Sequence, residues 1–282
     1  MATRIIIDSA SDINKQEALA LGVTLVSMEI KIGAEEFLDG VNLYPTEFYD
    51  KLIESDELPK TSQINPFRFE EEFERVVKAG DEAVVITISS KLSGTYQSAK
   101  SAAEKFAGEI FVVDSLNACI GERLLCEYAL RLIKEGRTAA QIAAELDEKK
   151  HKICLMAMLN TLEYLKKGGR ISAAVAFAGG ILSIKPVVAV EEGEIKLIGK
   201  AMGSKKGNNL LTVLVEKTGG IDFTMPCGVV WSGKDKSVLE KYVTDSARLW
   251  TEHTSDVPAY MIGCTIGTHI GPGAIGVAFF RK

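Results

Sequence analysis

Short runs of consecutive apolar residues alternate with longer, helix-like segments in the first half of the chain. The runs at 5–7, 84–88 and 110–113 consist mostly of isoleucine and valine. Uninterrupted apolar runs, in contrast to alternating ones, are typical of parallel strands that are covered on both faces. These three runs therefore predict the strands of a buried parallel sheet.

The segments between these runs have the spacing of amphipathic helices. Asn65 is followed by Pro66, the combination of an N-cap and a proline in the first turn. Apolar residues then recur at helical spacing, as they do again from 121 to 134 and after Thr138. Strands that alternate with helices predict an α/β fold.

A hairpin pattern marks the second half, in which we expect antiparallel pairing. Strand-like runs at 184–190 and 195–198 flank the turn sequence EEGE. The other elements expected here are a helix over 208–217, a strand at 229–231, a mostly helical stretch over 234–250, and strands near 260–262 and 277–280. We therefore predict two tightly packed α/β lobes, a parallel-sheet lobe over residues 1–158 and a mixed-sheet lobe over residues 159–282.

The composition narrows the range of functions. The chain has 282 residues, with 33 Lys and Arg against 38 Asp and Glu, and a formal net charge of −5. Such a mildly acidic chain is a poor candidate for nucleic-acid binding, which needs a basic face. Hydrophobic residues make up 46% of the chain. That is enough for a large core and for the lining of an apolar cavity.

The cysteines and the apolar stretches indicate in which cellular compartment the protein is expected. The five cysteines include no C-x-x-C pair, so neither a disulfide framework nor a metal site is expected. The N-terminus lacks the long apolar stretch of a signal peptide. Lys185 and Pro186 interrupt the apolar stretch 171–190, which argues against a membrane span. We therefore expect a cytoplasmic protein.

Residues 271–276 (GPGAIG) match the dinucleotide pattern G-x-G-x-x-G, but their position argues against that function. The fingerprint should follow a first strand and begin a helix. This segment instead precedes the last predicted strand. We interpret it as a tight glycine-rich turn. Its neighbour His269 would then lie beside backbone that allows the close approach of a ligand.

Asp8 and Asp12 follow the first predicted strand and offer an alternative, enzymatic interpretation. Two carboxylates beyond a parallel strand can hold Mg²⁺ in a phosphatase or another hydrolase. A haloacid-dehalogenase-like phosphatase needs its second Asp two residues after the first, where this chain has Ala10. We prefer the interpretation that Ser11 or Asp12 caps the next helix, while Asp8 accepts loop amides.

Two hydroxyl-rich segments near predicted helix starts indicate an anion site. Ser93 and Gly94 lie at one helix start, and Thr61 and Ser62 lie shortly before another. Both segments are expected beyond the carboxyl ends of strands, where open α/β sheets bind ligands. Hydroxyls joined by His269 suit a carboxylate better than a phosphate, which usually recruits a fixed positive charge. The apolar segment 171–184 is either a buried helix or the lining of a slot for a long apolar tail.

Six segments of this sequence occur in the order known from one protein family. They are residues 7–12 (IDSASD), 61–63 (TSQ), 89–96 (SSKLSGTY), 162–172 (LEYLKKGGRIS), 184–186 (IKP) and 269–273 (HIGPG). On these segments the chain resembles the DegV family of fatty-acid-binding (FakB-type) proteins. The resemblance extends over one module from residue 4 to residue 281, which is essentially the whole chain.

The resemblance implies a two-lobed α/β protein that buries one long-chain fatty acid between its lobes. The residues implied in holding the carboxylate are Thr61, Ser62, Ser93, Gly94 and His269, with Thr95 and Arg170 in the surrounding polar network. Proteins of this type are the non-catalytic carrier half of a bacterial fatty acid kinase of phospholipid metabolism. A separate ATP-dependent subunit phosphorylates the bound carboxylate to an acyl phosphate. The resemblance thus implies a fatty acid as ligand and no cofactor.

Two positions depart from the family pattern. Ile64 replaces a frequent proline, with little expected effect because the helix cap that follows is retained. Met202 replaces the arginine of a Lys-x-Arg sequence that is implied in docking to the kinase subunit. Lys200, Lys205 and Lys206 remain nearby. We therefore expect weak docking to a generic kinase subunit, and a lipid sensor without a kinase partner is the alternative.

Overall fold

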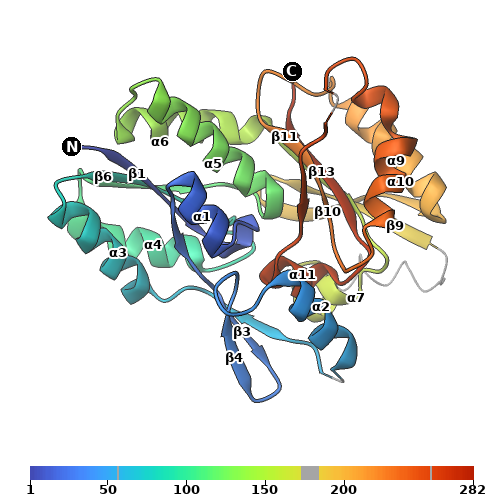
Figure 1. Ribbon diagram of the computed structural model, residues 1–282, viewed down its shortest axis with the longest axis horizontal. Coiled ribbons are helices and arrows are strands. Elements are labelled where there is room, and N and C mark those ends of the chain that lie inside the picture. The colour runs from blue at the N-terminus through green and yellow to red at the C-terminus, as the bar shows by residue number, and fades with distance from the viewer. Residues whose placement is uncertain (56, 173–183, 255) are drawn as a thin grey trace.

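Two large β-sheets lie side by side, one in each half of the chain, and helices pack on both (Figure 1). The computed structural model describes residues 1–55, 57–172, 184–254 and 256–282. The N-terminal sheet is parallel and the C-terminal sheet is mixed, so the predicted α/β fold class is confirmed. Within the described ranges, no helix is long and apolar enough to cross a membrane.

The N-terminal sheet has four parallel strands in the order β2-β1-β6-β7. Its strands are β1 (Thr3–Asp8), β2 (Thr24–Val26), β6 (Glu82–Thr87) and β7 (Ile110–Asp114). The isoleucine run of β1 pairs with the valines of β6, and the opposed residues Ile6 and Val85 are both fully buried. Burial on both faces explains why these strands are continuously apolar.

Helices cover both faces of this sheet, with α5 and α6 on one side and α3 and α4 on the other (Figure 1). The helices of this half are α1 (Lys15–Leu21), α2 (Pro45–Glu54), α3 (Pro66–Lys78), α4 (Thr95–Ala103), α5 (Cys119–Lys134) and α6 (Ala139–Lys149), with 3-10 turns η1 (Ser9–Ser11), η2 (Glu104–Phe106) and η3 (Lys150–Lys152). The Asn65 side chain accepts the Phe67 amide and the Thr138 hydroxyl accepts the Gln141 amide. The predicted caps therefore determine where α3 and α6 begin.

The C-terminal sheet has six strands in the order β10-β9-β8-β13-β11-β12. They are β8 (Ile153–Met158), β9 (Ile184–Glu191), β10 (Glu194–Met202), β11 (Cys227–Trp231), β12 (Ala259–Met261) and β13 (Ile275–Phe280). β9 and β10 form the predicted hairpin. β8 pairs with β9 and β13, although the first lobe was predicted to extend to residue 158. By sheet membership β8 therefore belongs to the second lobe, and the change of lobe precedes Ile153. The sequence could not indicate this, because a strand's distant partners leave no trace in its own sequence.

Within the described residues, the helices of the second half are short apart from α9. They are α7 (Glu163–Lys167), α9 (Ser204–Lys217), α10 (Ser237–Asp245) and α11 (Cys264–Ile270), with the 3-10 turn η5 (Ala247–Leu249). α9 packs on β8, β9 and β10, and α10 packs on β11 and β13 (Figure 1). α11 instead contacts α2, α7, η1 and the short strand β5 (Lys60–Ser62), and so lies at the junction of the lobes.

A third, antiparallel sheet has the order β4-β3-β5 and was not predicted. Its strands are β3 (Glu29–Ile32), β4 (Glu35–Leu38) and β5 (Lys60–Ser62). Thr61 and Ser62 therefore lie in a strand, and not in a loop beyond a parallel strand as the sequence suggested. A strand of three residues is too short to display an alternating pattern, and its pairing of Thr61 with Ile30 is distant in sequence.

Helix α5 joins the cores of the two lobes. It contacts β1 and β6 of the first sheet and β8, β11 and β13 of the second. Tyr128 of α5 packs edge-on against Phe280, with ring centroids 5.9 Å apart. One cluster of buried apolar side chains accordingly includes Ile6 from the first sheet and Leu155 from the second. This shared core holds the lobes against each other.

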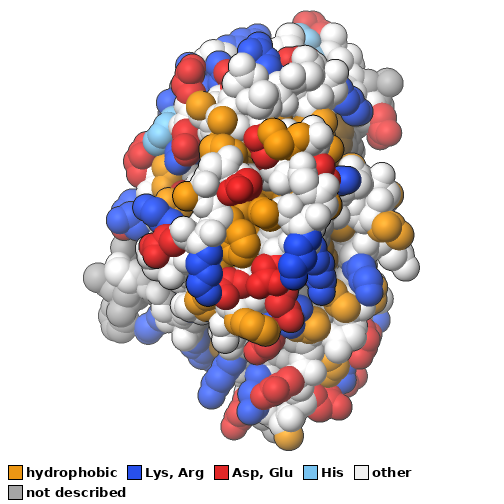
Figure 2. All heavy atoms as spheres, turned by 90° about the vertical axis from the view of Figure 1, so that its left-hand side faces the viewer, with side chains coloured by type: hydrophobic (Ala, Val, Ile, Leu, Met, Phe, Trp, Pro, Cys, Tyr) orange, Lys and Arg blue, Asp and Glu red, His pale blue; other side chains and the backbone are white. Residues whose placement is uncertain are grey.

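Acidic and basic side chains lie next to one another on the outer surface of the first lobe. α3 lies on the left of Figure 1, the side that faces the viewer in Figure 2. The ion pairs of this helix include Arg75 with Glu72, Lys78 with Glu74, and Glu70 with Lys105 of η2. Exposed pairs of this kind contribute little to stability, but they give this face a mixed charge.

The first four residues of the glycine-rich segment 271–276 form a turn between α11 and β13, and the last two belong to β13. Gly271 has φ 69° and Gly273 has φ 79°, and both values favour glycine. A Cβ on Gly271 would also overlap the ring of Tyr164 in α7. The turn thus brings backbone against α7 two residues after His269.

We predict that Gly271→Ala lowers the free energy of unfolding by roughly 3 kcal/mol, since it adds a steric overlap to backbone strain. Gly22→Ala is the matched control, because Gly22 has φ 73° but open space around its Cβ position. Its cost should be only about 1 kcal/mol. Chemical denaturation of both variants measures the difference. Equal losses would contradict the importance of the Tyr164 contact.

Candidate functional site

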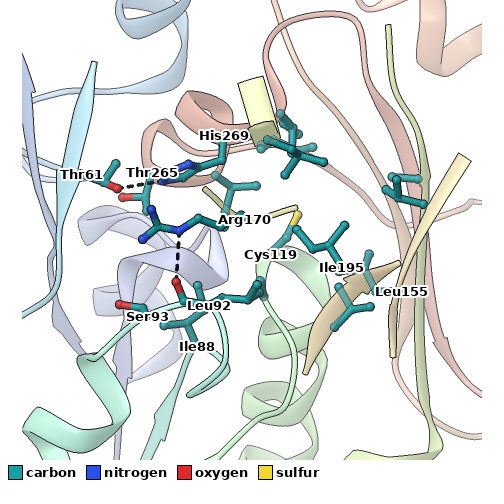
Figure 3. Close-up of a pocket in the computed structure, with 18 of the residues that line it drawn as sticks. Thr61, Ile88, Leu92, Ser93, Cys119, Leu155, Arg170, Ile195, Thr265 and His269 are labelled. Carbon is teal, nitrogen blue, oxygen red and sulfur yellow. Dashed lines mark hydrogen bonds between the residues drawn. The ribbon is translucent and has the colours of Figure 1, made fainter. Parts of the chain in front are cut away.

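A pocket lies between the two lobes, where the two large sheets and the small sheet meet (Figure 3). The space between its atoms is about 890 Å³, its open mouth included. Its walls come from β5, the loop after β6, the start of α5, strands β8 to β11, and α11. In Figure 3 polar side chains gather at one end, whereas Cys119, Ile195 and Leu155 extend toward the other.

Thr61 and His269 form the centre of the polar end. The Thr61 hydroxyl lies 2.8 Å from Nε2 of His269, and this contact joins β5 to α11. Thr265, one turn earlier in α11, contributes a buried hydroxyl (Figure 3). Ser62 and Ser93 line the same pocket and are more exposed. The structure thus brings together Thr61, Ser62, Ser93 and His269, which the sequence analysis assigned to one site.

Arg170 adds a positive charge to the polar end. Its Nε donates a hydrogen bond to the Leu92 carbonyl at 3.2 Å, and Nη1 donates to the Gly168 carbonyl at 2.5 Å. These bonds hold the guanidinium between the loop after β6 and the end of α7. The residue pattern alone indicated a site without lysine or arginine. Arg170, which only the family resemblance implied, lines the pocket.

The half-buried imidazole of His269 packs against Gly168, and its Nδ1 atom is buried. Nδ1 has no hydrogen-bond partner among the described residues, and a Cβ on Gly168 would overlap it. Gly168 therefore leaves the space that the imidazole occupies. Burial and the charge of Arg170 lower the pKa of His269 from its usual 6.5 to about 4. The ring is consequently neutral at neutral pH and offers one N–H donor and one acceptor.

The Ser93 hydroxyl is held just before α4. It lies 2.9 Å from Oγ1 of Thr95 and accepts the Thr95 amide at 3.3 Å. Thr95 Oγ1 in turn accepts the Ile64 amide at 3.3 Å, so the start of α4 is tied to the segment after β5. Gly94 was predicted to touch the ligand but does not line the pocket; a Cβ there would overlap the Gln63 side chain. Gly94 and Thr95 therefore lie behind the pocket lining, and the hydrogen bonds of Thr95 hold Ser93 and Ile64 in place.

Apolar side chains form the rest of the pocket. They include Ile88, Cys119, Leu155, Val188, Ile195 and Ile266. Burial raises the pKa of the Cys119 thiol, so this side chain stays protonated and acts as a small apolar group. The segment 171–184, expected from the sequence to be a buried helix or a slot lining, lies outside the described residues except at its ends.

Asp8 and Asp12 bind the backbone. The two oxygens of Asp8 accept the amides of Ala10 and Ile88, each at 2.8 Å, and Asp12 accepts the Gly263 amide at 2.9 Å. Burial raises the pKa of each carboxyl to about 7. The residues that the structure describes include no group of three or more His, Cys, Asp or Glu placed to hold a metal. These contacts do not favour the phosphatase alternative.

The helix that follows Asp12 is capped by a different residue than expected. Asn14, and not Ser11 or Asp12, accepts the amides of Gln16 and Glu17. Asp12 instead contacts Gly263, which is 251 positions away along the chain. This tertiary contact takes the carboxylate away from the local capping role that its position in the sequence predicts.

The residues expected at a partner surface lie at the end of β10 and the start of α9. Met202 is 62% exposed, and Lys200, Lys205 and Lys206 are exposed as well. None of the four lines the pocket between the lobes.

Thr265 belongs to the polar end but was absent from the sequence-based candidates. It precedes His269 by one helical turn, so the two side chains lie on the same face of α11. That spacing was a usable signal, but only once α11 was known to be a helix. The helix has seven residues and is flanked by glycines at 263 and 271, a composition that indicates a turn more than a helix.

Comparisons with known proteins give matches that extend over essentially the whole chain. The sequence model of the family described as uncharacterised protein, DegV family, matches residues 2–282. A DegV domain-containing protein of Caldanaerobacter subterraneus subsp. tengcongensis is 35% identical over 280 residues, 99% of this chain and 98% of the relative. A fatty-acid-binding DegV family protein from Thermus thermophilus superposes with a TM-score of 0.88 at 30% identity, over 100% of both chains. A DegV family protein from Eubacterium eligens, loaded with heptadecanoic acid, superposes with a TM-score of 0.84 at 26% identity, again over 100% of both chains.

We predict that one histidine of the ligand-free protein titrates near pH 4, because burial and Arg170 disfavour the charged His269 imidazole. A folded pKa below the unfolded value means that this residue costs stability as the pH falls from about 6.5 toward 4. NMR titration of the histidine side chains measures the value, and His269→Gln assigns the signal. An ordinary pKa for His269 would contradict its burial against Gly168.

Proposed function

The chain belongs to the DegV family, and we propose that it binds one long-chain fatty acid in the pocket between its lobes. The observation that carries the proposal is the division of this pocket into a polar end, at Thr61, Arg170 and His269, and apolar walls. The carboxylate would lie at the polar end and the acyl chain along the walls. The fatty acids bound by DegV family proteins of Thermus thermophilus and Eubacterium eligens support this assignment.

The acyl chain supplies most of the binding free energy. Each buried methylene contributes about 0.8 kcal/mol, so a long chain contributes on the order of 10 kcal/mol before the cost of ordering. Hydrogen bonds to the carboxylate contribute about 1.5–3 kcal/mol each. Affinity should therefore follow chain length, whereas the polar end determines the orientation in which the acid enters.

The groups of the polar end complement a carboxylate. With the proton on Nε2, the His269 imidazole donates to the Thr61 oxygen, and the Thr61 hydroxyl hydrogen is then available to the ligand. Ser93 contributes a second hydroxyl. Arg170 contributes the positive charge that stabilises the ionised acid in a partly buried place. Neutral His269 thus acts mainly by orienting Thr61.

We further propose that the protein presents this carboxylate to a fatty acid kinase subunit. Ser62 and Gln63, which line the same end, are exposed, so the carboxylate would be close to the surface. The partner would transfer the γ-phosphoryl group of ATP to a carboxylate oxygen, which yields an acyl phosphate and ADP. This chain supplies the binding and orientation of the acid and takes no part in the bond changes.

The surface at Met202 bears on the strength of that partnership. Arginine can form two parallel hydrogen bonds with a carboxylate on a partner, and methionine cannot. Lys205 and Lys206 can still attract an acidic partner as point charges, which accelerates encounter more than it stabilises the complex. Coupling to a generic kinase subunit should therefore be weak although the lipid is bound well.

We predict that the purified protein carries a fatty acid, seen in native mass spectrometry as a few hundred extra daltons that are lost on denaturation.

Ser93→Ala and His269→Ala should each weaken fatty-acid binding by roughly 1–3 kcal/mol with the fold intact. Their double variant should lose less than the sum, because both groups serve one carboxylate.

Ser90→Ala is the control for this series, since Ser90 is an exposed residue of the same loop that does not line the pocket. Its affinity should equal that of the natural chain. No bound fatty acid, together with no binding of an added one, would refute the proposed function. Unchanged affinity in well-folded Ser93→Ala would remove Ser93 from the site.

We predict that Met202→Arg increases acyl phosphate formation by lipid-loaded protein with a kinase subunit and ATP, while lipid affinity stays the same. Leu19→Arg is the control, because Leu19 is also exposed, at 83%, and lies in α1 of the other lobe. Full turnover by the natural chain would contradict the role given to Met202. If neither the natural chain nor Met202→Arg supports acyl phosphate formation, the result would instead favour a lipid sensor without a kinase partner.

A further inference from the structure

Helix α11 forms the wall of the pocket at its polar end. Thr265, Ile266, His269 and Ile270 all line the pocket. With seven residues, α11 is far too short to be stable in isolation and depends on tertiary contacts. The places of these side chains are therefore determined by what holds the two ends of the helix.

Asp39 caps the first turn of α11 from a remote part of the chain. Its Oδ1 accepts the Cys264 amide at 3.2 Å, and its Oδ2 accepts the Thr265 amide at 3.0 Å. Asp39 is 2% exposed and lies 225 positions before Cys264. A carboxylate here satisfies two amides that have no partner within the helix, and it interacts favourably with the helix dipole.

The residue at the N-cap position of α11 cannot supply this cap. That residue is Gly263, and a Cβ there would lie 2.9 Å from Oδ1 of Asp12, which is closer than side-chain carbons normally approach. Asp12 accepts the Gly263 amide at 2.9 Å, so the two residues are already in contact through the backbone. The capping oxygens must consequently come from elsewhere in the fold, and Asp39 provides them.

The small sheet holds α11 at both ends. Asp39 directly follows β4, Thr61 lies in β5, and β3 pairs with both of these strands. The backbone amide of Asp39 donates to the Met28 carbonyl at 3.0 Å, which fixes the residue next to β3. Thr61 contacts His269 in the last turn of α11. One sheet therefore positions the start of the helix and the imidazole near its end.

We propose that Asp39 is a positioning residue for the polar end of the pocket. By capping α11 it determines where Thr265 and His269 lie relative to Thr61, and so whether the pocket recognises a carboxylate. The inference rests on the proposed fatty-acid binding. Asp39 itself does not line the pocket and acts through α11. Loss of a cap bond would let α11 leave its binding position in some of the molecules. The apparent affinity for the fatty acid then falls in proportion to the fraction of molecules in which α11 is still in place.

Asp39→Asn tests the proposal, because it places an NH₂ group against one of the two amides at almost unchanged volume. Asp12→Asn is the matched control: Asp12 is also buried, and it accepts the Gly263 amide through one oxygen only, so asparagine can keep that bond. We expect Asp39→Asn to lower the affinity for hexadecanoate about tenfold and the affinity for hexadecanol clearly less, because the alcohol lacks the charged group that the polar end recognises. Asp12→Asn should change neither.

Titration of His269 by NMR provides a second measurement that needs no ligand. In ligand-free Asp39→Asn the pKa of His269 should rise from about 4 toward 6.5, because the imidazole is no longer held in its buried place. A folded Asp39→Asn protein that matches Asp12→Asn in ligand preference and in titration would overturn the proposal. An equal loss of affinity for the acid and the alcohol would overturn it too, since that result indicates a merely structural role.

If Asp39→Asn does not fold, hydrogen exchange on the natural chain tests whether Asp39 caps α11. The amides of Cys264 and Thr265 should be protected as strongly as those of the core strands, and rapid exchange would overturn the proposal. Exchange and titration are both measured without fatty acid. A natural chain that fails to bind hexadecanoate would therefore contradict the proposed function, whereas unprotected amides would contradict the role of Asp39.

Discussion

The contact between the Thr61 hydroxyl and the His269 imidazole is the interaction on which the site depends. It is 2.8 Å long and joins positions 208 residues apart. Neither of the elements that carry it has an independent basis for stability, because β5 has three residues and α11 has seven. Pairing with β3 holds β5, and packing on α2 and α7 holds α11. The polar end can therefore exist only when the small sheet and both lobes have folded together.

Burial of these polar groups limits their charge. Nδ1 of His269 lacks a partner among the described residues, and loss of hydration penalises the charged ring more than the neutral one. The same effect raises the pKa of Asp8 and Asp12 to about 7. Burial also lowers the pKa of Arg170, but a guanidinium stays charged in a protein, and the Leu92 and Gly168 carbonyls accept its hydrogen bonds. The polar end thus combines one cation with neutral donors, a set that suits a single carboxylate.

The apolar walls of the pocket continue the core that the lobes share. Ile88, Cys119 and Leu155 belong both to that core and to the pocket lining. An acyl chain in the pocket would therefore extend the packing between the lobes, and would not merely lie on a surface groove. This continuity links ligand binding to the contact between lobes, because both bury the same side chains.

The sequence by itself determined the elements whose signals are local. The isoleucines of β1, the caps Asn65 and Thr138, and the β9–β10 hairpin were all predictable, because burial on two faces, helix capping and turn chemistry act within a few residues. Residue type and family resemblance also singled out Ser93 and His269 as candidates. Only the tertiary structure decided that Thr61 lies in a strand opposite Ile30, that Asp12 contacts Gly263 while Asn14 caps α1, and that Asp39 caps α11. These contacts join distant parts of the chain, and their geometry comes from packing, which no local pattern of residues encodes.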